Sequence, residues 1–286
     1  MKRLPWLGAL LVGALSGCSP TSILNATVSD AGVSQTTDIA YAPGSRRTLD
    51  VYRPSMPGSG RPLIVFIYGG SWRGGSKSMY PFVARPLAQR GAVVVVPDYR
   101  VYPEVTYPSF LEDNALAVAW AFAHARELGA DPAKIVLLGH SAGAFDVAML
   151  ALDPRWLRAA GIDRDRLAGT VGLAGPYHFL PTTDSDVIPV FGPDNTPAHE
   201  PYAVADGHNS PILLMAGNED TTVRPHNTLD LAARLRSIGG PVADKIYPNL
   251  AHIGIITAFA PLFDRRAPVL DDVWAFVTRV TGQRRP

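Results

Sequence analysis

The organisation of this chain is decided by the stretch KIVLLGHSAGA, residues 134–144. Its apolar first half is typical of a buried strand, and apolar residues over 145–152 recur at helical spacing. The sequence therefore predicts a strand, a sharp turn and a helix. In that context the pattern G-x-S-x-G forms a nucleophile elbow, which lifts the serine oxygen above the sheet. Ser141 is the candidate nucleophile, and the alternative is a turn that only reverses the chain.

Length and composition favour a single large domain. The chain has 286 residues, of which 47% are hydrophobic, and this is enough for one large core. Lys and Arg number 26 and Asp and Glu 25, so the formal net charge of +1 offers no field for nucleic acid. We therefore expect no nucleic-acid partner.

The first residues are typical of an export signal. Two basic residues precede an apolar run over 4–15, which is too short to span a bilayer as a mature helix. The run ends at LSGC, and Cys18 is the only cysteine of the sequence. This end resembles the lipobox of bacterial lipoproteins, whose cysteine is lipidated after cleavage. The alternative is an ordinary secretory peptide that is cut nearby, with Cys18 discarded.

Both interpretations predict an exported protein. We expect a signal peptide over 1–17, a lipidated tether over 18–35 and the folded domain over 36–286. The lipid on Cys18 would be the membrane contact. Ser19 stands where the lipoprotein resemblance associates aspartate with inner-membrane retention, which favours the outer membrane; otherwise the protein is periplasmic or secreted. A lone cysteine forms no intramolecular disulfide.

The body of the chain alternates strands with helices after a hairpin. Two β-rich runs separated by the turn PGS at 43–45 predict that hairpin. Alternation after an antiparallel start predicts a three-layer α/β fold with a mostly parallel sheet. We expect strands over 36–41, 47–53, 62–68, 92–96, 134–138, 167–174, 211–216 and 244–247, and helices over 80–89, 109–128, 145–152, 225–238 and 267–281.

One connection is too long to be a plain loop. Residues 175–209 are rich in Pro, Asp, Asn and Gly. Long irregular segments in compact domains are usually functional. We expect an active-site loop or a small lid here.

A nucleophilic serine needs a base and a carboxylate that orients the base. Asp220 follows a buried strand and is the candidate acid, with Glu219 as its competitor and a solvated acidic turn as the alternative. His252 lies just beyond the last strand and is the candidate base, with His226 as the best rival. Both candidates follow strands, so they are expected at one edge of the sheet.

The developing negative charge needs backbone N–H donors. One should be the amide of Ala142, directly after the nucleophile. The other should come from the glycine-rich loop after the strand over 62–68, where Gly69 and Gly70 let the backbone approach closely. Gly70 is the preferred second donor, and Ser71 is a further candidate.

These motifs carry a family resemblance. YGGSW at 68–72 is similar to His-Gly-Gly-x-Trp, DYRVYPE at 98–104 is similar to Asp-Tyr-Arg-Leu-x-Pro-Glu, and GHSAG at 139–143 follows. The chain from about Asp50 resembles the esterase branch of the α/β-hydrolase fold, which includes hormone-sensitive-lipase-like carboxylesterases, acetylxylan/feruloyl esterase-like enzymes and kynurenine formamidases. In this fold the acid and the histidine follow the serine. The resemblance implies a three-layer α/β-hydrolase fold with little or no cap.

Two positions depart from the family pattern. Tyr68 stands where the family has histidine, which questions the hydrogen bonds that hold the oxyanion loop. Ser71 replaces a third glycine. The resemblance also implies that Asp98 and Arg100 are structural, as a pair that must be mutually satisfied near the elbow.

The expected activity is that of a serine carboxylesterase, which hydrolyses small carboxylic esters through an acyl-enzyme without a metal or cofactor. The alternatives are a formamidase or other amide hydrolase, and a non-catalytic surface lipoprotein that uses the fold for binding. Trp72 and Tyr177 are the candidate substrate-binding residues for a small apolar or aryl acyl group, and ordinary loop packing is the alternative for each.

Overall fold

The computed structural model describes residues 20–263, 265 and 267–282. These residues form an eight-stranded sheet in the order β1-β2-β4-β3-β5-β6-β7-β8. The pairs β1–β2 and β2–β4 are antiparallel, and every later pair is parallel. The strands are β1 (Val33–Ala40), β2 (Thr48–Pro54), β3 (Arg61–Ile67), β4 (Val93–Pro97), β5 (Ala130–His140), β6 (Gly169–Leu173), β7 (Ile212–Gly217) and β8 (Val242–Tyr247).

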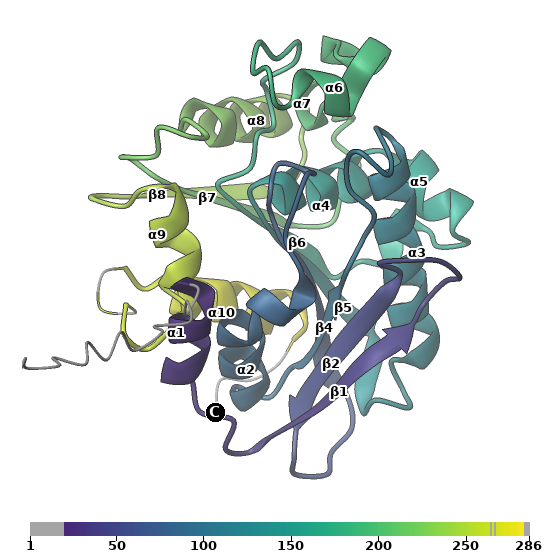
Figure 1. Cartoon of the computed structure of the whole chain (residues 1–286), viewed down its shortest axis with the longest axis vertical. Helices are drawn as coiled ribbons and strands as arrows, with labels where there is room; N and C mark the ends of the chain where they lie inside the picture. Colours follow the sequence, from purple (N-terminus) through teal and green to yellow (C-terminus); the bar gives the residue numbers. More distant parts are fainter. Residues whose placement is uncertain (1–19, 264, 266, 283–286) are drawn as a thin grey trace, which may run out of the picture.

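Helices cover both faces of this sheet. Figure 1 shows α1, α2 and α10 gathered on one face and α3, α4 and α5 on the other. The α-helices are α1 (Pro20–Thr27), α2 (Pro81–Gln89), α3 (Ser109–His124), α4 (Ala142–Leu152), α5 (Pro154–Ala159), α6 (Ile188–Phe191), α7 (Pro201–Val204), α8 (His226–Ser237), α9 (His252–Thr257) and α10 (Val269–Val280), and the 3-10 helices are η1 (Lys77–Met79), η2 (Arg164–Arg166), η3 (Gly192–Asp194) and η4 (Pro197–His199).

The predicted three-layer architecture is confirmed, because its central strands are apolar along their whole length. All residues of β4, β6 and β7 are buried, as expected for parallel strands covered on both faces. The antiparallel hairpin at the start of the sheet is also present. Together these strands place the ends of β3, β5, β7 and β8 along one edge, which is where the candidate site residues follow.

The N-terminal segment differs from the predicted tether in its described part. Residues 20–27 form α1, and Leu24 and Val28 are 8% and 4% exposed. The side chain of Asn25 accepts a hydrogen bond of 3.0 Å from the amide of Phe82, at the start of α2. Leu24 lies in α1 and Val28 directly follows it, and the small and polar composition of the segment concealed that both are buried. Cys18 and the signal segment lie outside the described residues.

The connection between β6 and β7 is neither a plain loop nor a large cap. Residues 175–209 contain α6, η3, η4 and α7. In Figure 1, α6 and α7 lie together at one end of the molecule, beside α8.

None of the helices described here combines the length and the apolar character that a membrane-spanning helix needs.

Candidate active site

The turn at Ser141 has the strained geometry of a nucleophile elbow. Ser141 stands between β5 and α4 with φ 56° and ψ −123°. A Cβ on Gly139 would lie 2.2 Å from the carbonyl oxygen of Gly143, and a Cβ on Gly143 would lie 2.1 Å from that of Ile67. Neither glycine could carry a side chain here, so the sequence pattern follows directly from the tight backbone.

The structure brings the predicted triad residues together. The Nε2 atom of His252 lies 2.9 Å from Ser141 Oγ, and its Nδ1 atom lies 2.8 Å from Asp220 Oδ2. Asp220 and His252 are both buried. The other carboxylate oxygen, Asp220 Oδ1, accepts from the amides of Thr222 and Val223 at 3.0 and 2.8 Å. These bonds fix the carboxylate, which in turn orients the imidazole toward the serine.

The rival residues lie elsewhere. Glu219 is exposed. His226 begins α8 and lines the cavity described below, without a hydrogen bond to Ser141 among the described residues. His140 is buried below the turn, and its Nε2 atom lies 3.2 Å from the carbonyl oxygen of His252. Burial and the neighbouring His252 lower the pKa of His140 to about 3, so this ring stays neutral and supports the backbone of His252.

The glycine-rich loop over 69–75, which we call the oxyanion loop, lies directly against the nucleophile. A Cβ on Gly69 would lie 2.7 Å from the Cβ of Ser141. The amides of Gly70, Ser71 and Ala142 donate no hydrogen bond within the described part of the chain. Ser71 and Ala142 line the same cavity as Ser141, whereas Gly70 is not among its lining residues. Ser71 holds φ at 53°, a left-handed value that is uncommon outside glycine and turns the loop toward the serine.

Tyr68 supplies hydrogen bonds that hold this loop in place of the family's histidine. Its hydroxyl donates to Asp98 Oδ1 at 2.6 Å and accepts from Arg46 Nη2 at 3.0 Å. The same Arg46 nitrogen donates to the carbonyl of Gly75 at 2.8 Å, at the far end of the loop. Burial and the charge of Asp98 raise the pKa of Tyr68, so the phenol stays protonated and donates. We name Arg46, Tyr68 and Asp98 the oxyanion-loop anchor.

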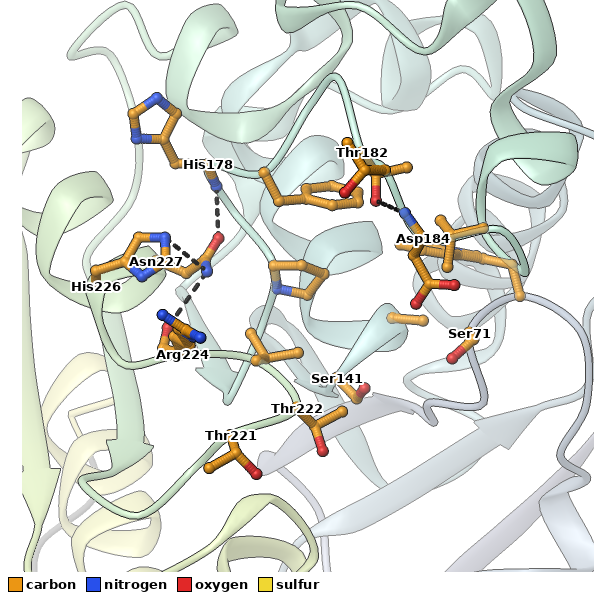
Figure 2. A pocket seen from close by; sticks show the side chains of 17 residues that line it. Ser71, Ser141, His178, Thr182, Asp184, Thr221, Thr222, Arg224, His226 and Asn227 are labelled. Carbon is orange, nitrogen blue, oxygen red and sulfur yellow. Dashed lines mark hydrogen bonds between the residues drawn. The ribbon is translucent and has the colours of Figure 1, made fainter.

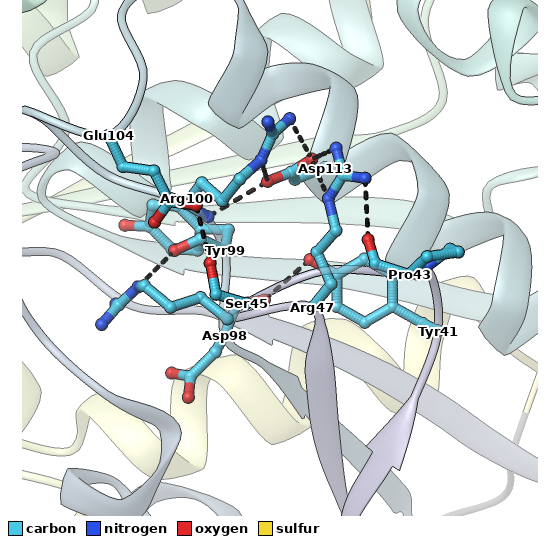
Figure 3. A network of polar contacts seen from close by, with 10 residues as sticks. Tyr41, Pro43, Ser45, Arg47, Asp98, Tyr99, Arg100, Glu104 and Asp113 are labelled. Atoms are coloured by element: carbon cyan, nitrogen blue, oxygen red, sulfur yellow. Dashed lines mark hydrogen bonds and ion pairs between the residues drawn. The ribbon is translucent and has the colours of Figure 1, made fainter.

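The expected pairing of Asp98 with Arg100 is wrong. Arg100 Nε donates to Asp113 Oδ2 at 2.8 Å, and Arg47 pairs with Oδ1 of the same carboxylate at 2.6 Å. Figure 3 shows the two arginines meeting at Asp113 while the Asp98 carboxylate points elsewhere. Proximity in sequence suggested the wrong partner, because Asp113 is fully buried on α3 and needs both cations.

A cavity of about 570 Å³ opens above Ser141. Figure 2 shows it bounded by side chains from the oxyanion loop, the segment 175–209, the loop after β7 and the start of α8. Its lining residues are Ser71, Trp72, Ser141, Ala142, Pro176, His178, Phe179, Thr182, Thr183, Asp184, Val187, Thr221, Thr222, Val223, Arg224, His226 and Asn227.

Trp72 forms part of the apolar wall of the cavity. Its ring stacks against that of Phe179, with centroids 6.2 Å apart. Its Nε1 atom donates to Asp146 Oδ1 at 2.9 Å. Asp146 is completely buried, which raises the pKa of its carboxyl group. This hydrogen bond fixes the plane of the indole in the cavity wall.

Tyr177 does not contact the cavity, so its predicted substrate-binding role is corrected. The side chain is fully buried and belongs to an apolar cluster with residues of α4, β7 and α8. A Cβ on Gly172 would lie 2.0 Å from the Tyr177 hydroxyl. The ring therefore fills space left by a glycine of β6, while Phe179, two residues later, lines the cavity instead.

Several supporting residues had no signal in the sequence. Arg46 occupies the hairpin turn, and Glu200 lies in the long connection, where nothing marks either side chain as buried or paired. Glu200 Oε2 accepts from the amides of Phe179 and Leu180 at 2.6 and 2.7 Å.

Across the described ranges, no group of three or more His, Cys, Asp or Glu residues is placed to hold a metal ion.

Comparisons with known proteins agree with this geometry. A family model described as the prolyl oligopeptidase family matches residues 112–284, and the BD-FAE model matches residues 49–161. The chain is 29% identical, over 87% of its length, to the esterase LipQ of Mycobacterium tuberculosis, of which it covers 63%. It is 24% identical, over 75% of its length, to a probable isoprenylcysteine alpha-carbonyl methylesterase of Arabidopsis thaliana, of which it covers 50%.

Solved structures with the same fold include esterases. A truncated carbohydrate esterase from gut microbiota superposes with a TM-score of 0.76 at 19% identity, covering 89% of this chain and 99% of that one. An esterase of Thermogutta terrifontis gives 0.72 at 24% identity, covering 90% and 95%. The chain spans about half to three fifths of the length of two curated isoprenylcysteine alpha-carbonyl methylesterases that it matches. The family match over more than half of the chain and the shared architecture together show that the chain belongs to the prolyl oligopeptidase family and has the α/β-hydrolase fold.

Proposed function

We propose that this protein is a serine carboxylesterase that hydrolyses small carboxylic esters. The observation that carries the proposal is the continuous hydrogen-bonded chain from Asp220 through His252 to Ser141, with the nucleophile at a strained turn. Relatives and fold neighbours that are named esterases support ester hydrolysis.

The geometry suggests a two-step reaction. Ser141 Oγ attacks the ester carbonyl carbon while His252 Nε2 takes its proton, and the amides of Ala142 and of the oxyanion loop receive the negative oxygen. The carbon–oxygen bond of the ester then breaks, and His252 gives the proton to the leaving alkoxide. Water repeats the sequence on the acyl-enzyme, releases the acid and restores Ser141. Asp220 holds the imidazole in the orientation that both steps need.

The cavity supports a small acyl group. Its volume of about 570 Å³ lies in the range of small-molecule pockets. Trp72, Phe179 and Val187 form an apolar wall next to Ser71 of the oxyanion loop. An acyl chain or ring can bury its surface there without leaving polar groups unpaired.

The proposal also includes export and membrane anchoring. A basic start, an apolar run over 4–15 and LSGC before Ser19 favour lipidation of Cys18 and retention at the outer membrane of a bacterial cell. Substitution of Cys18 by Ala should move the protein from the membrane fraction to the soluble fraction. Unchanged membrane retention of that variant would contradict the anchor.

Ester hydrolysis can be tested with the full chain and p-nitrophenyl acetate. Ser141→Ala should reduce kcat by about 10⁴-fold or more, because removal of the nucleophile disables the whole triad. Ser237→Ala, on the exposed end of α8, is the matched control and should retain full activity. Undiminished hydrolysis by Ser141→Ala would refute the mechanism. Faster turnover of N-formyl arylamines than of aryl acetates would instead indicate an amide hydrolase.

A further inference from the structure

The cavity above Ser141 carries charges of opposite sign on its two sides. Figure 2 shows Arg224, His226 and His178 on one side, and Asp184 and Ser71 on the other. We propose, building on the proposed esterase function, that the site selects esters whose alcohol part carries a carboxylate, and that Arg224 binds this carboxylate.

Arg224 is free to bind a ligand. The side chain is exposed and lines the cavity. Among residues 20–263, 265 and 267–282, its guanidinium forms no ion pair and no side-chain hydrogen bond. The planar guanidinium offers paired N–H donors that match the two oxygens of a carboxylate. The first turn of α8, directly after Arg224, contains no acidic residue, so the helix dipole adds to the positive potential.

The neighbouring carboxylates are occupied by other partners. Asp220 is bound by His252 and by two backbone amides. Asp230 Oδ2 lies 2.9 Å from His178 Nδ1. Glu200 is buried and accepts from two amides of the segment 175–209. The remaining cavity carboxylate, Asp184, lies across the opening from Arg224 (Figure 2). An anionic substrate group would therefore be the natural partner for Arg224.

The reaction geometry decides which part of the ester meets Arg224. His252 must protonate the leaving oxygen, so the alcohol part lies on the imidazole side of Ser141. The loop that begins at Asp220, the partner of His252, continues through residues 221–224 along that side. The acyl part lies toward Trp72 and Ser71, beside Asp184. A carboxylate on the alcohol part would meet Arg224, whereas one on the acyl part would meet the like charge of Asp184.

The test compares matched substrates on the full chain. Each pair differs in one charge: 4-acetoxybenzoate against 4-acetoxybenzamide for the alcohol part, and mono-(4-nitrophenyl) adipate against 4-nitrophenyl hexanoate for the acyl part. The readout is the ratio of kcat/KM for the charged to the uncharged member of each pair. Ratios are compared between variants, so the intrinsic reactivity of each ester cancels.

Arg224→Met should lower the alcohol-part ratio about tenfold, which is the scale of one charge-assisted hydrogen bond at a partly solvated site. Arg224→Lys should lower it less, and added salt should lower the wild-type ratio. Asp184→Asn should raise the acyl-part ratio and leave the alcohol-part ratio nearly unchanged. Arg126→Met removes the same charge from an exposed position outside the cavity and should change neither ratio.

Failure of this inference is distinguishable from failure of the proposed function. Hydrolysis of the uncharged esters by the wild type, together with an alcohol-part ratio that Arg224→Met leaves unchanged, would overturn the role of Arg224 and keep the esterase. No hydrolysis of any of the four esters would refute the proposed function itself. Thermal melting of each variant, monitored by circular dichroism, confirms that its fold is intact.

Discussion

The two segments that enclose Ser141 are held in different ways. The oxyanion loop is fixed by partly buried polar contacts from distant parts of the chain, through the anchor of Arg46, Tyr68 and Asp98. The segment 175–209 is held mainly by aromatic packing around Phe179 and Phe191, with one buried carboxylate at Glu200. Backbone donors for a developing charge must be placed precisely, whereas a wall for an acyl group needs only shape. Damage to the loop should therefore reduce kcat, and damage to the segment should reduce stability and substrate binding.

Among the changes that distinguish the two segments, Glu200→Ala is expected to have the largest effect. This change leaves the amides of Phe179 and Leu180 buried without an acceptor, at a cost of about 3 kcal/mol in the free energy of unfolding. Urea denaturation measures the loss, and KM should rise more than kcat falls. Glu200→Gln keeps an acceptor oxygen and should lose clearly less. Equal stability of the alanine variant and the wild type would contradict the role of Glu200.

A smaller effect, on kcat rather than on stability, is expected from Tyr68→Phe. Loss of the hydroxyl removes the direct bond to Asp98 and one contact of Arg46, so the oxyanion donors are held less precisely. We expect kcat to fall about 10- to 100-fold with KM nearly unchanged. Tyr80→Phe is the matched control, because its ring stacks on Tyr68 at 5.3 Å but its hydroxyl forms no hydrogen bond with the described residues. A rise in KM with unchanged kcat in Tyr68→Phe would contradict the role of the oxyanion-loop anchor in placing the oxyanion donors.

The effect that is smallest at neutral pH is a pH dependence of stability at the buried His140. Its pKa of about 3 in the folded protein lies below the ordinary value of 6.5. The unfolded chain therefore binds a proton that the folded chain does not, so stability falls as the pH drops from 6.5 toward 3. The slope from this group is at most about 1.4 kcal/mol per pH unit.

His140→Gln tests this contribution to acid sensitivity. Glutamine can still donate to the carbonyl of His252 but does not titrate, so the variant should lose less stability than the wild type over the same pH window. Urea denaturation at pH 7, 5.5 and 4.5 compares the two proteins. Parallel stability profiles for the two proteins would contradict the assignment of this effect to His140.

Local patterns predicted the parts of the site that follow strands. Ser141, Asp220 and His252 follow the ends of β5, β7 and β8 within a few residues, so their common position at one sheet edge could be predicted from the order of the elements. The tight turn at Ser141 could also be predicted from Gly139 and Gly143, because a side chain at either position would clash with the backbone.

Long-range contacts could not be predicted in the same way. The role of Arg46 depends on contact between the hairpin turn and the oxyanion loop. Arg100 pairs with Asp113 and not with Asp98, which is nearer in the sequence. Tyr177 and Phe179 belong to one short stretch, yet only Phe179 reaches the cavity, because Tyr177 fills the space beside Gly172. Composition likewise concealed α1, which is anchored by the buried Leu24 and by Val28 just after its end.

The proposed role of Ser141 as the nucleophile of an ester hydrolase can be tested with an active-site label. The full chain is treated with a fluorophosphonate, and the modified residue is located by mass spectrometry of its peptides. We expect one adduct, on Ser141, with loss of esterase activity in proportion to labelling and no adduct in Ser141→Ala. A protein that hydrolyses esters while Ser141 stays unmodified, or an adduct on another serine that abolishes activity, would contradict it.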